Sequence, residues 1–368
     1  MIIERVIISG GGTGGHIFPA IAIADEIKKR NPQAKVLFVG AKGKMEMEKV
    51  PQAGYKIEGL EIAGFQRKFT FSNFLLPIKI AKSLLKARKI IKRFKPDLVI
   101  GVGGYASGPT LKMAQFIGIP TVIQEQNSFP GKTNRILAKK TECICTAYEG
   151  MEKYFPKTRV VLTGNPVRKE LTGESNCERQ EAQKVFNLNP ELPTVLVIGG
   201  SLGAKTLNES MLHGVEEFNA HGVQLLWQCG KHYFEHLQDE LIAKDKSNIH
   251  LHQFISRMDC AYAAADIIIS RAGAISVSEL SIVGKPVILV PSPNVSEDHQ
   301  TKNAMALVDK NAALLVRDAD ARKLLVDEAL KLIKDSNRCQ QFSRAIKTLE
   351  KPNAVAEIVD MCEKILNE

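Results

Sequence analysis

Residues 5–16 read RVIISGGGTGGH, and this stretch decides how the start of the chain folds. The apolar run up to Ile8 is typical of a buried parallel strand, and five of the six residues in Gly10–Gly15 are glycine. From Ile17 to Lys29 apolar residues recur at helical spacing, and Pro19 is allowed in a first helical turn. A strand, a glycine turn and a helix start together offer backbone N–H groups and a helix dipole to an anion.

The same loop satisfies the dinucleotide pattern G-x-G-x-x-G with Gly10, Gly12 and Gly15. An NAD site also needs a carboxylate about 20 residues further on, at the end of the second strand. That strand ends in Val39-Gly40-Ala41-Lys42 and carries no acid there. We therefore disfavour a dehydrogenase, although a lysine at this place suits the 2′-phosphate of NADP, which stays open on the loop chemistry alone.

Apolar runs typical of strands alternate with amphipathic stretches along the whole chain. The runs are 6–8, 36–39, 98–100, 121–123 and 143–146, and, after a break, 195–198, 224–228, 267–270 and 287–290. This alternation predicts an α/β fold with parallel sheets covered on both faces. A second strand–glycine unit, Val195–Ala204, echoes the first, so we expect two Rossmann-like domains, residues 1–163 and 164–349, facing across a ligand-binding cleft.

The bulk composition narrows the class of protein. A length of 368 residues suits two domains, and a formal charge of +10 favours an anionic partner: nucleic acid, an acidic membrane face or a phosphorylated substrate. The seven cysteines form no C-x-x-C pair, so we expect reduced thiols rather than a zinc site or a disulfide framework. With no signal peptide and no long apolar run, we expect a cytoplasmic protein without a membrane span.

Most of the excess charge lies in Phe65–Lys95, which holds ten basic residues and no acid. Phenylalanines and leucines are interleaved at its start, before a helix that we expect from about Ile78 to Phe94. Its buried stripe is predicted to be Ala81, Leu84, Ala87, Ile91 and Phe94. Three interpretations of the segment are open: a solvated basic helix, a docking site for an anionic bilayer, and a nucleic-acid site. For the third, the sequence holds no recognition motif.

The second half carries another strand, turn and helix start. Asp266–Ser270 is a predicted strand, Arg271–Ala274 the turn, and Ile275–Leu280 the start of a helix that again suits an anion. Glu279 either caps this helix or accepts from both hydroxyls of a ribose. The polar run Glu297–Ala304 is predicted to begin a further helix facing the same cleft.

Six motifs in this order make the chain resemble the MurG type of glycosyltransferase, within the two-domain GT-B group. They are Gly11–Pro19, Gln124–Asn127, Thr163–Arg168, Gly199–Ala204, Arg271–Glu279 and Glu297–Ala304. The resemblance spans essentially the whole chain. It implies transfer of GlcNAc from UDP-GlcNAc to the 4-hydroxyl of MurNAc in lipid I, giving lipid II of peptidoglycan, with inversion and without a cofactor. It also implies that a last helix, within about 350–368, packs back on the first domain.

The resemblance also implies roles for individual residues. Thr13, Gly14, Gly15 and Asn127 lie near the transferred sugar and the acceptor, and the opening loop faces the acceptor diphosphate. Arg168 and Ser201 address the donor diphosphate, the main chain of Ile255 reads the uracil, and Gln300 contacts GlcNAc. The nucleotide is framed by Ala274, Ile275, Ser276, Val277, Ser278 and Glu279, the last on the ribose. Many members have two glutamines where this chain has His299-Gln300, so His299 is left without an assigned role.

The chemistry needs a stabilised diphosphate leaving group and a base for the incoming hydroxyl. Helix starts at Ser201 and Ala274 together with Arg168 suit the first task without a metal. The single D-x-D string, Asp318-Ala319-Asp320, is interpreted as a turn and helix cap rather than a metal site. His16, the ionisable side chain of the opening loop, is the candidate base, while a structural role or a contact to acceptor phosphate remains the alternative.

A polyprenyl-anchored acceptor places such an enzyme at the cytoplasmic face of the cell membrane, so Phe65–Lys95 becomes a predicted peripheral docking patch. Related UDP-sugar enzymes, a diacylglycerol galactosyltransferase or a UDP-GlcNAc 2-epimerase, are the nearest alternatives. A non-catalytic nucleotide- or nucleic-acid-binding protein is the alternative from another class, and it leaves the six ordered motifs unexplained.

Overall fold

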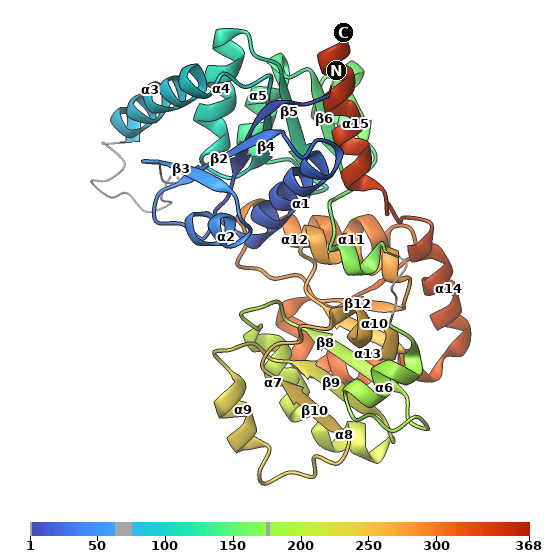
Figure 1. Cartoon of the computed structure of the whole chain (residues 1–368). Helices are drawn as coiled ribbons and strands as arrows, with labels where there is room; N and C mark the ends of the chain where they lie inside the picture. Colours follow the sequence, from blue (N-terminus) through green and yellow to red (C-terminus); the bar gives the residue numbers. More distant parts are fainter. Residues whose placement is uncertain (1, 63–75, 174–176) are drawn as a thin grey trace. The chain divides into compact units, whose positions relative to one another are not determined.

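The computed structural model describes residues 2–62, 76–173 and 177–368. The chain forms two compact units, Met1–Val167 together with Lys351–Glu368, and Arg168–Glu350. Each unit is a parallel β-sheet flanked by helices (Figure 1), so the predicted α/β class with two Rossmann-like sheets is confirmed.

The sheet of the first unit has the strand order β3-β2-β1-β4-β5-β6-β7, and every pair is parallel. Its strands are β1 (Arg5–Gly10), β2 (Lys35–Ala41), β3 (Lys56–Leu60), β4 (Leu98–Gly103), β5 (Thr121–Glu125), β6 (Cys143–Thr146) and β7 (Val160–Leu162). Its α-helices are α1 (Gly14–Arg30), α2 (Glu46–Gln52), α3 (Leu76–Phe94), α4 (Ser107–Ile117), α5 (Lys132–Leu137) and α15 (Ala354–Asn367).

Alternate residues of β1 point to two separate cores, as the two-residue period of a strand requires. Val6 and Ile8 pack with residues of α1 and α15, whereas Ile7 packs with residues of α3, α4 and α5. Figure 1 shows α15, in red, running beside the strands of this unit although it ends the chain. Both faces of β1 are therefore buried, which explains its unbroken apolar run.

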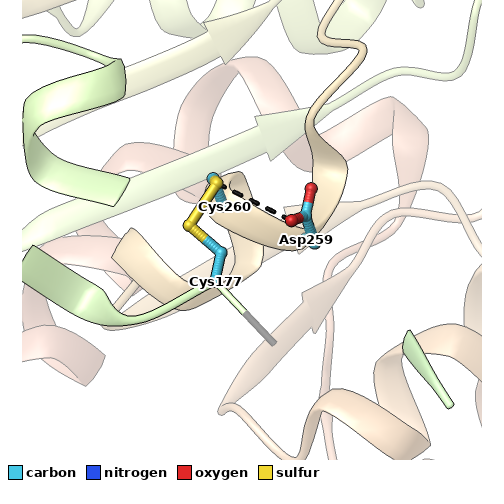
Figure 2. Close-up of side chains that lie close together, drawn as sticks. All are labelled: Cys177, Asp259 and Cys260. Carbon is cyan, nitrogen blue, oxygen red and sulfur yellow. Dashed lines mark hydrogen bonds between the residues drawn. A yellow bond between two sulfur atoms is a disulfide. The ribbon is translucent and has the colours of Figure 1, made fainter. Parts of the chain in front are cut away.

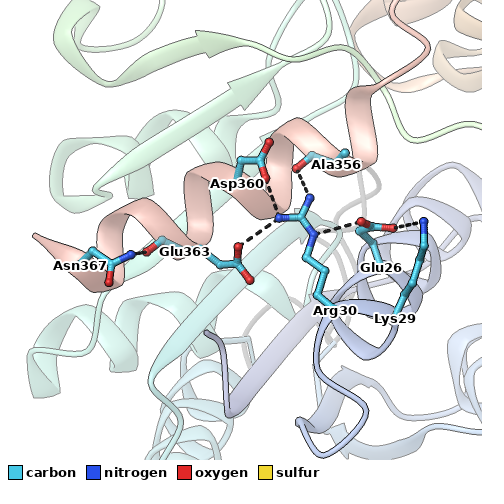
Figure 3. A network of polar contacts seen from close by, with 7 residues as sticks. All are labelled: Glu26, Lys29, Arg30, Ala356, Asp360, Glu363 and Asn367. Carbon is cyan, nitrogen blue, oxygen red and sulfur yellow. Dashed lines mark hydrogen bonds and ion pairs between the residues drawn. The ribbon is translucent and has the colours of Figure 1, made fainter. Parts of the chain in front are cut away.

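An ion-pair network fastens α15 to α1 (Figure 3). Arg30, near the end of α1, contacts Asp360 Oδ1 at 2.5 Å and Glu363 Oε2 at 3.1 Å through Nη1. Its Nη2 donates to the Ala356 carbonyl at 3.0 Å, and its Nε donates to Glu26 at 3.0 Å. Two nitrogens of this guanidinium thus hold the last helix against the first one, while Nε is held by Glu26 of α1 itself.

The sheet of the second unit has the order β10-β9-β8-β11-β12-β13, again all parallel. Its strands are β8 (Thr194–Ile198), β9 (Gln224–Gln228), β10 (Ile249–His252), β11 (Ile267–Ser270), β12 (Val287–Leu289) and β13 (Leu314–Leu315). Its α-helices are α6 (Arg179–Val185), α7 (Lys205–His213), α8 (Val215–Ala220), α9 (Phe234–Glu240), α10 (Met258–Ala264), α11 (Ala274–Val283), α12 (His299–Val308), α13 (Ala321–Lys334) and α14 (Ser336–Lys347). Its main core surrounds the fully buried Trp227 and Phe218.

The strand order predicts where each unit binds a ligand. In the first sheet the order reverses between β1 and β4, and in the second between β8 and β11. Ligands of open α/β sheets bind at the carboxyl ends of the strands where the order reverses. The loops at these points are Gly10–Thr13 and Gly103–Tyr105 in the first unit, and Gly199–Gly203 and Arg271–Gly273 in the second.

Several sequence predictions differ from the structure in detail. The edge strands β3, β7, β10 and β13 were not predicted, because strands with a solvated edge are short and less apolar. Helix α1 begins at Gly14, so Pro19 lies in its second turn rather than its first. The buried stripe of α3 is Ser83, Ala87, Ile90 and Ile91, whereas Ala81 is exposed.

Among the residues that the structure describes, no helix is long and apolar enough to cross a bilayer.

Candidate active site

The glycine loop after β1 is shaped by its neighbours as much as by any ligand. A Cβ on Gly10 would lie 2.2 Å from Val102 Cγ2, and one on Gly11 would lie 2.2 Å from Glu46 Cδ. Gly12 has a φ of +87° and faces open space. Gly10 and Gly11 are therefore glycines because the fold leaves no room, while Gly12 is a glycine because of its backbone conformation.

His16 lies in the first turn of α1 with its ring turned back onto this loop. Its Nδ1 is 3.0 Å from the Gly11 carbonyl oxygen and 3.3 Å from Thr13 Oγ1. Because a carbonyl only accepts, the contact to Gly11 places the proton of a neutral ring on Nδ1 and makes Nε2 the basic nitrogen. The ring packs on Gly103, where a Cβ would lie 2.7 Å from His16 Cδ2.

Glu46, the first residue of α2, is a site residue that the sequence did not reveal. Only 1% of it is exposed; Oε2 accepts from the Gly12 N–H at 2.8 Å and Oε1 from the Ala41 N–H at 2.9 Å. A carboxylate from the next helix thus lies at the end of β2 and binds a backbone N–H of the glycine loop. No pattern marks it, because a charged residue at a helix start is normally a solvated one.

A buried carboxylate holds Asn127 at the end of β5. Glu125 Oε1 accepts from the Asn127 N–H at 3.1 Å and from Asn127 Nδ2 at 3.3 Å. Its Oε2 accepts from the Gly131 N–H at 3.2 Å and from Asn134 Nδ2 at 2.8 Å. Burial raises the pKa of Glu125, and these four donors oppose that rise. Asn127, a predicted site residue, is therefore anchored at both its backbone and its side chain.

Two of the sequence motifs meet beside Asn127. Gln124 Nε2 donates to Asn165 Oδ1 at 2.9 Å, and Asn165 Nδ2 donates to the Gln126 carbonyl at 3.0 Å. All three side chains are buried. The motif after β5 and the motif after β7 thus form one hydrogen-bonded layer at the carboxyl end of the sheet.

In the second unit, the loop after β8 differs from the prediction. Helix α7 begins at Lys205, so Ser201 lies in the preceding turn and not at a helix start. Gly200 and Gly203 have φ values of +84° and +80°, and a Cβ on Gly203 would lie 1.9 Å from the Cys229 carbonyl oxygen. Gly203 thus passes close to the end of β9, where there is no room for a Cβ.

Arg168 and Glu279, two predicted donor-site residues, pair with each other. Arg168 Nε is 2.6 Å from Glu279 Oε1, and the Tyr262 hydroxyl donates to Glu279 Oε2 at 3.3 Å. Burial raises the pKa of Glu279, while the charge of Arg168 opposes it. The proposed capping role of Glu279 is wrong, because its carboxylate faces Arg168 and Tyr262. Tyr262 on α10 was not singled out, because a tyrosine in an apolar helix is normally core.

Helix α11 begins at Ala274, with Gly273 as its N-cap residue. Ser278 donates from Oγ to the Ala274 carbonyl at 3.2 Å, and Val277 is buried, whereas Ile275 and Ser276 are half-buried. Only three residues separate the end of β11 from this helix start, which lies at the point where the strand order reverses.

The D-x-D string serves the fold. Asp318 Oδ1 contacts Arg271 Nη1 at 2.5 Å, and its Oδ2 accepts from Thr206 Oγ1 at 3.0 Å. Asp320 precedes α13 but makes no side-chain cap; it pairs with Arg317 at 2.8 Å instead. The turn was predicted correctly, and the cap was not.

The remaining residues predicted to bind the donor, and His299 beside them, contact nearby residues of the same unit. The Ile255 N–H donates to Gln228 Oε1 at 2.9 Å. Gln300 Oε1 accepts from the Ser292 N–H at 2.8 Å, and His299 Nε2 lies 3.4 Å from Glu297 Oε2. Gln300, in the first turn of α12, is thus held against the segment that follows β12.

Comparison with known families decides the assignment. Residues 6–146 match the glycosyltransferase family 28 N-terminal domain, and residues 194–358 match the glycosyltransferase family 28 C-terminal domain. The chain belongs to glycosyltransferase family 28.

Curated relatives within family 28 extend over the full chain. A UDP-N-acetylglucosamine--N-acetylmuramyl-(pentapeptide) pyrophosphoryl-undecaprenol N-acetylglucosamine transferase of Parabacteroides distasonis is 55% identical, over 99% of each chain. A protein of the same name from Christiangramia forsetii is 54% identical, over 99% of this chain and 98% of its own. The resemblance to the MurG type inferred from the six motifs is confirmed.

Solved structures agree on the architecture. MurG of Acinetobacter baumannii superposes with a TM-score of 0.79 at 28% identity, over 98% of this chain and 99% of that one. A UDP-GlcNAc 2-epimerase of Neisseria meningitidis has a TM-score of 0.66 at 16% identity, over 98% of this chain and 100% of that one. The second likeness concerns the fold alone.

One cysteine pair contradicts the prediction of reduced thiols. Cys177, before α6, and Cys260, on α10, form a disulfide (Figure 2) with a Cα–Cα distance of 5.0 Å. With Asp259 they are also the one group of three metal-capable side chains among the described residues, but the bridge occupies both sulfurs. The two cysteines are 83 positions apart, so sequence spacing could not predict the pairing.

The predicted membrane patch, Phe65–Lys95, lies partly outside the described residues, since residues 63–75 are not described. The part in α3 leaves Leu85, Lys89 and Lys92 exposed, with Leu85 at 66% exposure.

Proposed function

We propose that this family 28 chain transfers GlcNAc from UDP-GlcNAc to the 4-hydroxyl of MurNAc in lipid I and so forms lipid II. The observation that carries the proposal is the 55% identity, over 99% of both chains, to a relative named for this transfer. UDP-GlcNAc and lipid I are accordingly its substrates, and no cofactor takes part.

In the first unit we assign the acceptor to the loop after β1. Gly14 and Gly15 begin α1, and Thr13 is its N-cap residue. This is the sheet position where α/β folds bind anions, which suits the acceptor diphosphate. His16 is the proposed base: Nε2 removes the proton of the incoming hydroxyl while Nδ1 stays bonded to the Gly11 carbonyl. Asn127, held by Glu125, contacts the reacting sugars.

In the second unit we assign the donor to the loops after β8 and β11. The start of α11, Ala274–Ser278, and Ser201 in the turn after β8 offer polar groups to the UDP moiety. Arg168 supplies the fixed cation for the departing diphosphate, and Glu279 binds the ribose. For Ile255 we assign the carbonyl to the uracil N3–H, because its N–H already donates to Gln228. Gln300 is assigned to the GlcNAc hydroxyls.

We propose that the transfer needs no metal ion. The support is that Asp318, half of the D-x-D string, already contacts Arg271 and Thr206. Arg168 and the start of α11 can stabilise the leaving diphosphate instead. Activity that survives EDTA treatment is the expected result.

We place the enzyme at the cytoplasmic face of the cell membrane as a peripheral protein. A lipid-anchored acceptor requires this location, and the ten basic residues of Phe65–Lys95 suit an anionic bilayer better than nucleic acid, for which no recognition motif is present. Sedimentation with anionic vesicles at low salt tests this, and protein that stays in the supernatant would contradict it.

Incubation with labelled UDP-GlcNAc and a lipid I analogue tests the activity. Labelled lipid II analogue is the expected product. Formation of UDP-ManNAc or of free ManNAc would instead indicate an epimerase, and binding without turnover would indicate a nucleotide-binding protein. Neither alternative is favoured, because the two curated relatives above 50% identity carry the transferase name, whereas the epimerase is only 16% identical.

A further inference from the structure

We propose that Glu46 is a positioning residue for His16 and acts through the peptide group that joins Gly11 to Gly12. The proposal rests on the proposed role of His16 as the base. It assigns to a residue of α2, outside every motif of the sequence, control over which ring nitrogen of His16 carries the proton.

Both partners bind the same peptide group from opposite ends. The N–H of this group belongs to Gly12 and donates to Glu46 Oε2 at 2.8 Å. The carbonyl of the group belongs to Gly11 and accepts from His16 Nδ1 at 3.0 Å. The order is therefore carboxylate, peptide N–H, peptide C=O, imidazole Nδ1–H.

A chain of hydrogen bonds of this kind is cooperative. A carboxylate that accepts from the N–H draws electron density toward the carbonyl oxygen, which becomes a stronger acceptor for the imidazole. The effect is stronger where water is excluded, and Glu46 is 1% exposed. The ring is thereby favoured with its proton on Nδ1, so Nε2 is the nitrogen that can take a proton from a hydroxyl.

The pocket around Glu46 is built to hold this arrangement. A Cβ on Gly11 would lie 2.2 Å from Glu46 Cδ, and a Cβ on Gly40 would lie 2.5 Å from Glu46 Cγ. On its other side Gly11 is packed by Gly104, where a Cβ would lie 2.3 Å from the Gly11 carbonyl oxygen. Glu46 and Gly104 thus pack closely on Gly11 from two sides, which restricts rotation of the peptide group.

A carboxylate is required at position 46 because two N–H groups point at it. Oε1 accepts from the Ala41 N–H at 2.9 Å while Oε2 accepts from Gly12. A glutamine can satisfy only one of them, since its amide nitrogen is a donor. Glu46→Gln therefore keeps the size of the side chain but weakens the clamp and removes its charge.

The structure also offers a partner for the other tautomer of His16, in which Nε2 carries the proton. Thr13 Oγ1 lies 3.3 Å from the same Nδ1 and can donate to it once the ring proton moves to Nε2. That tautomer places the lone pair of Nδ1 against the Gly11 carbonyl, and it removes the basic nitrogen from Nε2. Glu46 strengthens the first tautomer against the second.

The first experiment reads the tautomer directly. The ¹⁵N shifts of the histidine rings are recorded for labelled protein, with His16→Gln to assign the signal. We expect Nδ1–H, Nε2-unprotonated His16 in the parent protein and a measurable shift toward Nε2–H in Glu46→Gln. Glu48→Gln, an exposed position of the same helix, should leave the signal unchanged. An unchanged His16 signal in Glu46→Gln would overturn the proposal.

The second experiment is a double-mutant cycle on turnover. Glu46→Gln should lower kcat by about tenfold, the lower end of what losing an orienting partner costs, with little change in KM for UDP-GlcNAc. In a His16→Ala background the same substitution should lower kcat by less than about twofold. A tenfold loss that persists there means that Glu46 does not act through His16. The variant Glu46→Asp keeps the charge but shortens the side chain. Its kcat is measured in parallel and should lie between those of the parent protein and Glu46→Gln.

The two experiments separate the two claims. Near-normal turnover of His16→Ala would remove His16 as the base, whatever its tautomer. The ring signal would then still show whether Glu46 sets the tautomer of His16. If Glu46→Gln does not fold, Glu46→Asp is read by the same ring signal.

Discussion

The Arg168 guanidinium lies against the Glu279 carboxylate, with Nε 2.6 Å from Oε1, so two residues expected on the donor bind each other in this structure. The side chain of Glu279 is 6% exposed, whereas that of Arg168 is 41% exposed. A ligand that takes Glu279 must therefore compete with Arg168 or be bound together with it. Loss of this pair is therefore expected to change both the stability and the affinity for the proposed donor.

Arg168→Met should lower the free energy of unfolding by about 1–3 kcal/mol, because it leaves a buried carboxylate without its charged partner. Urea unfolding measures the change. Glu279→Gln in the same variant should restore part of it. Arg317→Met is the control, since the side chains of Arg317 and of its partner Asp320 are 79% and 36% exposed. An equal loss in the control would mean that burial of Glu279 does not matter.

Glu125→Gln should lower kcat about tenfold, because an amide cannot accept from all four donors that now hold Asn127 and the loop behind it. Its effect should be non-additive with Asn127→Ala, since both substitutions disturb the same side chain. Steady-state kinetics of the single and double variants check this. Glu152→Gln, at an exposed position, should be silent; full additivity would separate Glu125 from Asn127.

Reduction of the Cys177–Cys260 bridge should destabilise the second unit by about 4 kcal/mol, because the bridge closes a long loop and restricts the unfolded chain. The loop spans 83 positions. Denaturant unfolding with and without dithiothreitol measures the loss, and Cys177→Ser should abolish the difference. Cys339→Ser, at a free cysteine, should retain it.

Stability should fall as the pH drops below about 6.5, in part because of two histidines on β10. Burial lowers the pKa of both His250 and His252 below the ordinary value of 6.5, so the unfolded chain binds their protons more readily. Their contribution is present above that pH and is lost as the pH falls through their folded pKa. Replacing both histidines by glutamine should reduce the fall of the melting temperature between about pH 7.5 and about pH 5.5. An unchanged pH slope would assign the loss to other groups.

Gly203→Ala should be far more damaging than Gly200→Ala, although both glycines have positive φ. A Cβ at Gly203 would lie 1.9 Å from the Cys229 carbonyl oxygen, whereas nothing lies within 4 Å of one at Gly200. We expect about 1 kcal/mol for backbone strain at Gly200 and at least about 3 kcal/mol at Gly203. Thermal unfolding of both variants compares them. Similar losses would show that the loop adjusts freely.

The fold class followed from the sequence because both faces of the central strands are buried, which leaves continuous apolar runs such as Val6–Ile8. The edge strands β3, β7, β10 and β13 lacked that signal, since fewer neighbours cover them. The glycine loops were located correctly for a related reason: they follow the buried strands directly. What each glycine does was not predictable, because the neighbours of Gly11 and Gly203 come from distant segments.

The α/β class, the two repeated strand–glycine units and the family could all be predicted from the amino-acid sequence, since six motifs stand in a characteristic order. Which side chains contact each other depends on the folded arrangement. Glu46 reaches Gly12, Arg168 reaches Glu279 over 111 positions, and Cys177 reaches Cys260. Local periodicity records whether a residue is buried, but its partner depends on how the sheet brings separate strand ends together. The opening glycine loop is therefore defined as much by a buried carboxylate as by its own residues.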